Sequence, residues 1–377
     1  MPIARREIKT LGLSLPLLGF GFMRLPKTEN GKIDKARSKA MLKNAFEQGV
    51  NYFDTAYMYH DGESELVLGE LIKDYPRESF HVATKLPMMR VKTKADAEEV
   101  FEEQLKKLDV DYFDFYLVHA FDRHRLELFG KEGIYDFLLE KKKQGFIKHI
   151  GFSFHDSPDV LKEIIDTYEW DFVQIQLNYL DWTLQDAKKQ YELLAAKNLP
   201  VVVMEPVRGG YLANLPDDVA KILKDFAPER SIASWALRWV ASLPSVAVIL
   251  SGMSNEEQVA DNLATLSVDK PLSAEERTTL DHAVDVLQNK KSIPCTACRY
   301  CIDCPSGVDI PEIFGLYNRH MLYGEDFRVW STYTNVMPKN TLANNCTECG
   351  YCETQCPQQI KIIDELKVCH QKITTLR

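Results

Sequence analysis

The stretch "DKARSKAMLKNAFEQGVNYFDTA", residues 34–56, joins two kinds of secondary structure within one short segment. Its first part places apolar residues three and four positions apart, which is typical of an amphipathic helix. Asp34 is a suitable N-cap for this helix, and Gly49 is a suitable end. The apolar run that begins at Asn51 then predicts a strand. A helix followed directly by a strand is the repeating unit of an α/β fold.

The same alternation continues through the first two thirds of the chain. Eight strand-like runs begin near residues 17, 51, 80, 112, 146, 171, 200 and 245. Helical patterns lie between them, among others at 95–109, 133–145 and 254–266, with Gly145 as an end and Ser254 as an N-cap. No G-x-G-x-x-G fingerprint follows the first run. The pattern therefore predicts a closed parallel (β/α)8 TIM barrel rather than an open doubly wound sheet.

The segments outside this repeat define the predicted domains. Residues 6–16 read as a short hairpin that covers the barrel floor, and residues 273–291 as a helix capped by Ser273 that leaves the barrel. The chain beyond is rich in loops and cysteine, with a helical connector at 306–324. We expect a barrel over residues 1–290 and a small, mainly α, cysteine-rich domain over 291–377.

Composition excludes several classes of function. The 377 residues are 45% hydrophobic, which is enough for a substantial core, and the net charge of -9 is not gathered into a basic stripe. A nucleic-acid partner is therefore not expected. The N-terminal residues lack a signal-peptide pattern, and no apolar run approaches the roughly 20 residues of a membrane helix. These features predict a soluble, cytoplasmic protein without a membrane partner.

Cysteine is distributed unevenly along the chain. None of the nine cysteines precedes Cys295, and eight of them form two runs: Cys295, Cys298, Cys301 and Cys304, then Cys346, Cys349, Cys352 and Cys356. Tight C-x-x-C repeats in a long cytoplasmic chain favour metal or cluster ligation over disulfides. Two four-cysteine zinc sites are one alternative. Cys369 lies outside both runs, and we expect it to be a packed thiol.

The second run, "CTECGYCETQCP", fits the C-x-x-C-x-x-C-x-x-x-C-P pattern of bacterial ferredoxins. The first run, "CTACRYCIDCP", departs from it by having two residues between Cys301 and Cys304. Together the two runs resemble a two-cluster 4Fe-4S ferredoxin domain. That resemblance implies two crossed ligand sets: one 4Fe-4S cluster on Cys295, Cys298, Cys301 and Cys356, and another on Cys346, Cys349, Cys352 and Cys304.

Polar residues occupy the ends of three successive strand-like runs, where barrel enzymes place their active sites. They are Asp54 and Tyr59 after the second run, Lys85 at the end of the third and His119 at the end of the fourth. Each one alone is as well explained by capping, pairing or packing. Together they form a plausible proton-handling site.

The segments "NYFDTAYMYHDGESELVLGE", "VATKLP", "DFYLVHA", "IGFSFHD", "FVQIQLN" and "SGMSNEEQVADNL" resemble the aldo-keto reductase family. The resemblance implies that Tyr59 protonates a carbonyl oxygen while nicotinamide delivers hydride to the carbon. Because an ordinary tyrosine has a pKa of roughly 10, a neighbouring Lys85 ammonium is expected to lower it. Asp54 would keep Lys85 charged, and His119 would orient the carbonyl.

The resemblance also implies the residues that hold NAD or NADP. Ser153 and Gln174 match positions that bind the nicotinamide carboxamide, although Phe154 stands where the family usually has Asn, and Met204 lies where a side chain packs on the ring. Arg208 is expected either at the diphosphate or on the surface. The adenosine end of the cofactor is expected to contact Ser251, Gly252, Ser254, Gln258 and Asn262. No Lys or Arg stands among these, which makes NADP preference doubtful and leaves NAD open.

The combined chain resembles bacterial aldo-keto reductase-like oxidoreductases with C-terminal ferredoxin domains. It is expected to interconvert a carbonyl and an alcohol substrate, with clusters that exchange electrons with a redox partner or stabilise their domain. A redox-sensing or electron-transfer subunit whose barrel binds cofactor with little turnover is the alternative. Trp182, Phe121 and His124 are candidates for lining the substrate pocket, with packing or surface roles equally open.

Overall fold

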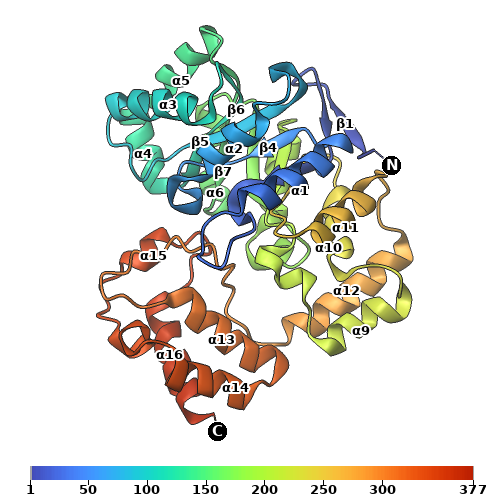
Figure 1. The fold of residues 1–377 in the computed structure, drawn as a ribbon, viewed down its shortest axis with the longest axis vertical. Helices are drawn as coiled ribbons and strands as arrows, with labels where there is room; N and C mark the ends of the chain where they lie inside the picture. Colours follow the sequence, from blue (N-terminus) through green and yellow to red (C-terminus); the bar gives the residue numbers. More distant parts are fainter. Residues whose placement is uncertain (1, 377) are drawn as a thin grey trace. The chain divides into compact units, whose positions relative to one another are not determined.

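The computed structural model describes residues 2–376, which divide into two compact units (Figure 1). The first unit runs up to Val207 and resumes over Ser234–Leu272. The second comprises Arg208–Ala233 and the chain from Ser273 onward. The second unit thus takes in segments that precede residue 290, and the domain boundary expected there stays a prediction.

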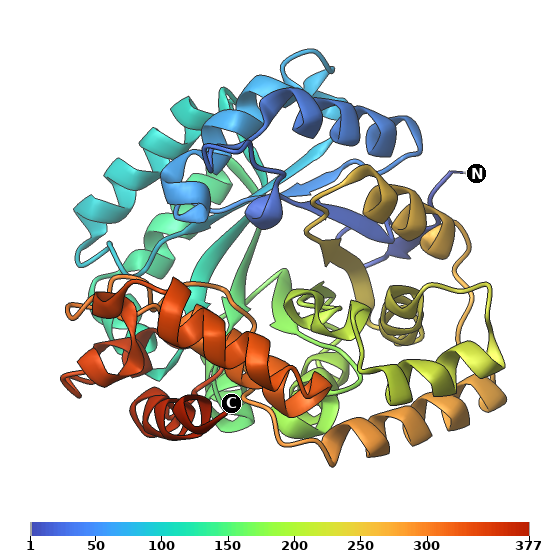
Figure 2. The same ribbon diagram turned by 60° about the horizontal axis from the view of Figure 1, so that its bottom comes forward.

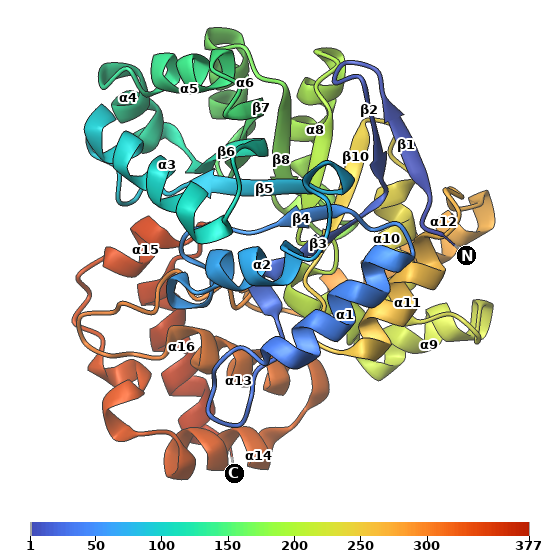
Figure 3. The ribbon, with the colours of Figure 1, turned by 45° about the horizontal axis from the view of Figure 1, so that its top comes forward.

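The first unit is built on a closed barrel of eight parallel strands, and the predicted barrel is confirmed (Figure 3). Neighbouring strands follow one another in sequence around the barrel, and the last pairs with the first. The strands are β3 (Leu18–Gly21), β4 (Tyr52–Asp54), β5 (His81–Leu86), β6 (Phe113–Phe121), β7 (Ile147–Phe154), β8 (Phe172–Gln176), β9 (Val201–Met204) and β10 (Val246–Ser251). All eight fall on the predicted strand-like runs.

Helices follow the strands and surround them (Figure 2). Their amphipathic faces bury apolar residues at three- and four-residue spacing, as Met41, Leu42 and Ala45 do in α1. The helices are α1 (Lys35–Glu47), α2 (Ser64–Ile72), α3 (Lys94–Leu108), α4 (Arg123–Lys131), α5 (Ile134–Lys143), α6 (Pro158–Thr167), α7 (Asp181–Leu184), α8 (Ala187–Ala196), α10 (Ile232–Ala241) and α11 (Glu256–Leu266).

The N-terminal hairpin covers one end of the barrel. Its strands β1 (Arg5–Ile8) and β2 (Leu13–Pro16) pair antiparallel. Leu15 is fully buried in one apolar cluster with Tyr52, Phe115 and Phe172, which lie in the N-terminal halves of their strands. The hairpin therefore closes the barrel floor, as predicted, and leaves the carboxyl ends of the strands for a site.

The second unit is mainly helical, as predicted. It contains α9 (Asp217–Phe226), α12 (Ala274–Gln288), α13 (Ile310–Tyr323), α14 (Asp326–Ser331), α15 (Tyr351–Gln355) and α16 (Ile362–Thr375). α9 and α12 lie side by side (Figure 1), and Arg230 in the loop after α9 pairs with Glu276 in the first turn of α12. Ser273 caps α12 through a capping box, and α13 is the connector expected between the cysteine runs. Ile313, Phe314 and Leu366 belong to its buried core.

Two local features differ from expectation. The N-cap of α11 is Asn255, whose side chain accepts from the Gln258 amide at 2.8 Å, while the Ser254 hydroxyl donates to the Arg24 carbonyl. The expectation that Ser254 caps this helix was therefore wrong by one residue. The C-terminal α16 was not anticipated.

In the part of the chain that the structure describes, no helix combines the length and apolar character needed to span a bilayer.

Candidate active site and cysteine pockets

Three consecutive strands carry the four residues expected to act in proton transfer. Asp54 is the last residue of β4, and Tyr59 begins the short turn that follows, Tyr59–Gly62. Lys85 lies near the end of β5 and His119 near the end of β6. All four are at most 9% exposed. The closed barrel therefore brings them to one end, as the sequence pattern predicted.

Short distances connect these side chains. Lys85 Nζ donates to Asp54 Oδ1 and to the Thr55 carbonyl, each at 2.7 Å. The same nitrogen lies 5.1 Å from the centre of the Tyr59 ring. The Tyr59 and His119 rings meet edge to face with their centres 6.1 Å apart. An ammonium, a phenol and an imidazole are thus grouped over one buried carboxylate.

Burial controls the charges in this group. It lowers the pKa of Lys85 below its ordinary value, and the Asp54 carboxylate opposes that shift. It raises the pKa of Asp54, with Lys85 acting in the opposite direction. Burial, assisted by the positive charge of Lys85, holds the pKa of His119 well below its usual range. His119 is therefore a neutral imidazole near neutral pH, able to donate one hydrogen bond without carrying charge.

The turn that begins at Tyr59 has a strained backbone that sequence reasoning did not foresee. His60 and Asp61 both adopt positive φ, at 52° and 56°, although neither is glycine. The ring of His60 accepts from the Leu25 amide at 3.3 Å. Consecutive left-handed residues persist only where their surroundings hold them, so this turn fixes the direction of the Tyr59 side chain.

Residues expected at the nicotinamide lie on the next strands around the barrel. The Ser153 hydroxyl on β7 accepts from the Ala120 amide at 2.8 Å, and Ala120 has a positive φ of 51°. Gln174 on β8 directs its amide nitrogen at the sulfur of Met204, 3.5 Å away. Its Oε1 is buried and has no hydrogen-bond partner among the described residues. An orphaned acceptor beside Met204 fits the amide protons of a nicotinamide carboxamide.

The residues expected near the adenosine form two separate hydrogen-bonded pairs, with Gly252 packed nearby. Asn262 donates to the Ser251 hydroxyl at 2.9 Å, and both are buried. Ser254 and Gln258 lie together at the start of α11, where the Ser254 amide donates to Gln258 Oε1. Gly252 is packed against the side chain of Arg24, which would touch any added Cβ at 3.1 Å.

The fold also brings arginines to this segment from more than 200 residues earlier in the sequence. Arg37 on α1 forms a forked ion pair with Glu256 on α11, with Nε to Oε1 at 2.8 Å. Arg24 lies 3.8 Å from Glu205. The local segment itself contains no Lys or Arg, so these arginines were not predicted. Each arginine is, however, matched by a carboxylate.

Arg208 is buried, with 4% of its surface exposed, so the surface-cation alternative is wrong. It adopts a positive φ of 50°, and its guanidinium lies 3.4 Å from the Pro294 carbonyl, directly before Cys295. A role at the cofactor diphosphate stays a prediction.

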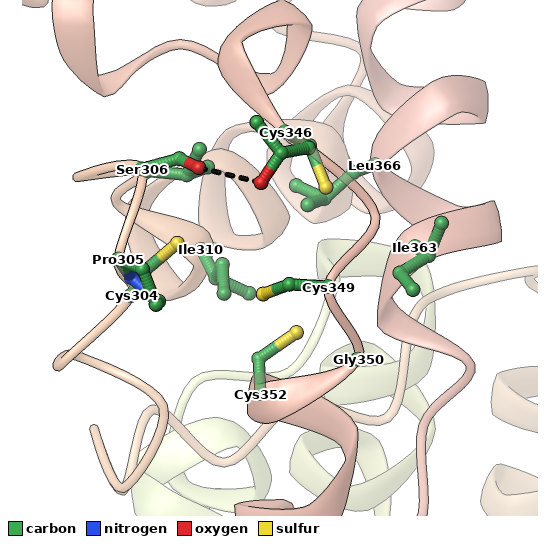
Figure 4. Close-up of a pocket in the computed structure, with 12 residues that line it drawn as sticks. Cys304, Pro305, Ser306, Ile310, Cys346, Cys349, Gly350, Cys352, Ile363 and Leu366 are labelled. Atoms are coloured by element: carbon green, nitrogen blue, oxygen red, sulfur yellow. Dashed lines mark hydrogen bonds between the residues drawn. The ribbon is translucent and has the colours of Figure 1, made fainter.

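The eight clustered cysteines divide into two sets of four. One pocket is lined by Cys304, Cys346, Cys349 and Cys352 (Figure 4). A second is lined by Cys295, Cys298, Cys301 and Cys356. Each pocket takes three cysteines from one run and the last cysteine of the other. This is the crossed grouping implied by the resemblance to two-cluster ferredoxins.

The surroundings of these thiols suit a cluster. Both pockets have apolar walls, with Ile310 contributing to each. Burial and the neighbouring thiols raise the pKa of Cys301 to about 12 and that of Cys352 to about 11. Neighbouring thiolates would repel one another, and a bound iron-sulfur cluster would relieve that repulsion because it ligates the sulfurs as thiolates.

Other cysteine and aromatic candidates are accounted for by packing. Cys369 is fully buried in the apolar core of the second unit, as expected for a packed thiol. Phe121 is fully buried against Phe129, with ring centres 4.9 Å apart, and therefore does not line a pocket. Trp182 packs edge to face on Trp239 at 5.1 Å.

A closed barrel with this polar group at its strand ends, followed by a two-pocket cysteine domain, defines an NAD(P)-dependent oxidoreductase with an iron-sulfur appendage. Comparison with protein families supports this class for both the barrel and the cysteine-rich domain. Residues 17–285 match the aldo/keto reductase family, and residues 294–363 match a 4Fe-4S dicluster domain. The chain belongs to the aldo/keto reductase family.

Individual relatives are distant. A probable aldo-keto reductase 1 of Glycine max is 29% identical over 216 residues, covering 54% of this chain and 60% of that protein. The NADH-specific methylglyoxal reductase of Escherichia coli K12 is 25% identical, over 69% of this chain and 91% of that protein. Among solved structures, the holo form of aldo-keto reductase AKR11C1 from Bacillus halodurans is 27% identical, with a TM-score of 0.64 over 74% of this chain and 96% of that one.

Proposed function

We propose that this protein interconverts a small carbonyl compound and its alcohol with a nicotinamide cofactor, and that Tyr59 is the proton donor. The observation that carries the proposal is the Lys85–Asp54 ion pair, buried beside the Tyr59 ring. A buried ammonium next to a phenol stabilises its phenolate, and a donor whose anion is stabilised gives up a proton more readily. Asp54 keeps the ammonium charged in a site that otherwise favours the neutral amine.

When bound, the nicotinamide cofactor would supply a hydride to the carbonyl carbon. In the same reduction Tyr59 gives its hydroxyl proton to the carbonyl oxygen, so that a C–H and an O–H bond form and the C=O double bond becomes single. Neutral His119 donates a hydrogen bond to that oxygen and holds it near Tyr59. Oxidation of the alcohol is the same path reversed. Gln174 and Ser153 would hold the carboxamide of a bound nicotinamide, and Met204 would pack beside it.

We further propose a preference for NADH over NADPH. A 2'-phosphate needs unpaired positive charge near the adenosine ribose. Of the two arginines at the expected adenosine segment, Arg37 is bound to Glu256, whose carboxylate would repel a second anion. Arg24 lies 3.8 Å from the Glu205 carboxylate. Comparison of the dissociation constants of the two reduced cofactors tests this, and tighter binding of NADPH would contradict it.

The cysteine domain is proposed to bind two 4Fe-4S clusters that exchange electrons with a redox partner. Clusters accept one electron at a time whereas nicotinamide gives two, so a direct relay needs a one-electron intermediary. Matches to residues 17–285 and 294–363 support a domain boundary near residue 290. Thiol-rich runs of this kind are typical of reducing compartments, which supports a cytoplasmic location.

Replacement of Tyr59 by Phe tests the barrel chemistry. We expect kcat for the reduction of methylglyoxal by NADH to fall by about 10²–10⁴-fold, because one positioned proton donor is lost. The matched control is Tyr57→Phe, which removes the same hydroxyl two residues away, where it donates to Glu103 at 2.9 Å. Full activity of Tyr59→Phe toward a panel of small aldehydes and ketones would contradict the proposal. Cofactor binding without turnover of any of them would favour the sensing alternative.

Anaerobic spectroscopy tests the clusters. Protein purified without oxygen is expected to contain iron and sulfide in equal amounts and to lose visible absorbance on chemical reduction. Bleaching by NADH would show electrons passing from the barrel to the clusters. If NADH leaves the cluster absorbance unchanged while carbonyl reduction proceeds, the clusters would instead transfer electrons to a partner protein or stabilise their domain. A colourless protein containing zinc would overturn the cluster assignment.

A further inference from the structure

Glu65 on α2 is a buried carboxylate that the proposed chemistry does not use. None of its surface is exposed. Thr84 Oγ1 and Gln104 Nε2 both donate to its Oε1, each at 2.6 Å. Its Oε2 has no hydrogen-bond partner among the described residues. Burial of a carboxylate with one oxygen unpaired is costly, so the position calls for a compensating role.

The bonds around Glu65 reach the backbone of the strand that carries Lys85. Gln104 Nε2 also donates to the Lys85 carbonyl at 3.0 Å. The Tyr116 hydroxyl donates to Gln104 Oε1 at 2.7 Å and fixes the orientation of that amide. Since side chains alternate along a strand, Thr84 faces the helices while Lys85 faces the barrel interior. Glu65 therefore holds β5 from the side opposite Lys85.

Glu65 also adds a second negative charge near the ammonium. Inside the barrel Lys85 is paired with Asp54, and burial works against its charge. The Glu65 carboxylate acts in the same direction as Asp54 and favours the ammonium. Burial raises the pKa of Glu65 itself, and the hydrogen bonds from Thr84 and Gln104 oppose that rise. The other titratable groups that face this pair are Tyr59 and His119 around Lys85, and Lys107, Glu103 and Tyr116 around Glu65.

We propose that Glu65 is a positioning residue for catalysis, which acts through β5 to keep Lys85 charged and in place beside Tyr59. It contacts neither substrate nor cofactor in this role. The inference rests on the proposed function of Tyr59 and Lys85 and identifies a residue behind the strand on which that function depends.

The first test replaces Glu65 by Gln. The Gln oxygen can accept the same two hydrogen bonds, so the charge is removed while the network is kept. Loss of a negative charge lowers the proton affinity of Lys85, so the ammonium that stabilises the Tyr59 phenolate is lost at lower pH. We expect the titration that forms the alkaline limb of kcat for methylglyoxal reduction to move to lower pH by about half to one unit. It is measured as the pH profile of kcat with and without Glu65→Gln.

Two controls separate this role from structure alone. Glu65→Asp keeps the charge and should restore the titration of the unaltered protein. Glu102→Gln deletes an exposed carboxylate on α3 that pairs with Lys141, and should leave the titration in place. An unshifted titration in a folded Glu65→Gln protein would overturn the inference.

A second variant covers the case in which Glu65→Gln does not fold. Gln104→Leu cuts the link from Glu65 to the Lys85 carbonyl, and we expect a kcat at least about tenfold lower with an unchanged KM for NADH. An unchanged kcat would overturn the inference. If the Glu65 variants behave like the unaltered protein while Tyr59→Phe is inactive, this inference alone is refuted. Full activity of Tyr59→Phe would refute the proposed function itself.

Discussion

At the scale of single residues, the Lys85–Asp54 pair is where stability and chemistry conflict. Both groups are removed from water, and each is compensated chiefly by the other at 2.7 Å. A buried ion pair is seldom worth more than the apolar residues that could replace it, but it is costly to break. Stability alone therefore does not explain the pair at the strand ends, which agrees with the proposed role of the ammonium beside Tyr59.

The Asp54→Asn substitution should destabilise the barrel by about 3 kcal/mol, because it leaves the Lys85 ammonium buried without its carboxylate. The Lys85 pKa, already lowered by burial, should fall further. The folded variant then releases this proton before the unfolded chain does, so its stability should recover as pH rises toward about 10. Urea unfolding across this pH range measures both effects.

The double variant Asp54→Asn/Lys85→Met provides the control. With both charges removed, the free energy of unfolding should return most of the way to that of the unaltered protein. A double variant as unstable as the sum of its single changes would show that the two residues act independently. That outcome would contradict the ion-pair argument.

At the scale of elements, close approach of α2 to the end of α3 fixes the helix that follows Tyr59. A Cβ added at Gly69 on α2 would lie 2.7 Å from the Leu108 carbonyl oxygen, which is backbone and cannot rotate away. We expect Gly69→Ala to cost about 1–3 kcal/mol by forcing the two helices apart. The same movement should lower kcat, because α2 carries Glu65.

The matched control is Gly315→Ala in α13, where an added Cβ meets nothing within 4 Å. Alanine is the better helix former by about 1 kcal/mol, so this change should stabilise its unit slightly. Thermal unfolding of both variants gives the comparison. Equal effects of the two changes would contradict the packing argument at Gly69.

The strands and most helices were predictable because their signals are local. Periodic apolar residues, together with caps such as Asp34 and Ser273, define an element within a short window of sequence. The Asn255 cap was missed because Ser254 and Asn255 are both competent caps. The choice between them depends on the Arg24 carbonyl, which accepts from the Ser254 hydroxyl. Arg37 was missed at the adenosine segment for the same reason: its partner Glu256 is distant in sequence.

The site shows the same division between local and long-range information. Asp54, Tyr59, Lys85 and His119 could be identified from strand ends and motifs, and the structure brings them together. Glu65 could not, because its role depends on Thr84 and Gln104 packing around it from two other elements. The left-handed residues His60 and Asp61 carry no sequence signal that distinguishes them from an ordinary turn.

At the scale of the whole molecule, each cysteine pocket combines three cysteines of one run with the last cysteine of the other. This crossed grouping brings together segments of the second unit that are about 50 residues apart. Cys304 from the first run lies with the second, and Cys356 from the second lies with the first. The shortened spacing between Cys301 and Cys304 does not prevent this, since Cys304 still reaches the pocket of Cys346, Cys349 and Cys352 (Figure 4). Cluster ligation would thus supply folding energy as well as redox chemistry.

Paired serine substitutions test the crossing directly. Cys304 and Cys352 line the same pocket, so Cys304→Ser/Cys352→Ser should lose one cluster and keep about half of the iron. Cys301 and Cys304 belong to the same run but to different pockets, so Cys301→Ser/Cys304→Ser should lose both clusters and nearly all iron. Each run ligating its own cluster would give the opposite pattern. Iron and sulfide analysis of anaerobically purified protein decides between them, with Cys369→Ser, a buried thiol outside both pockets, expected to retain full iron.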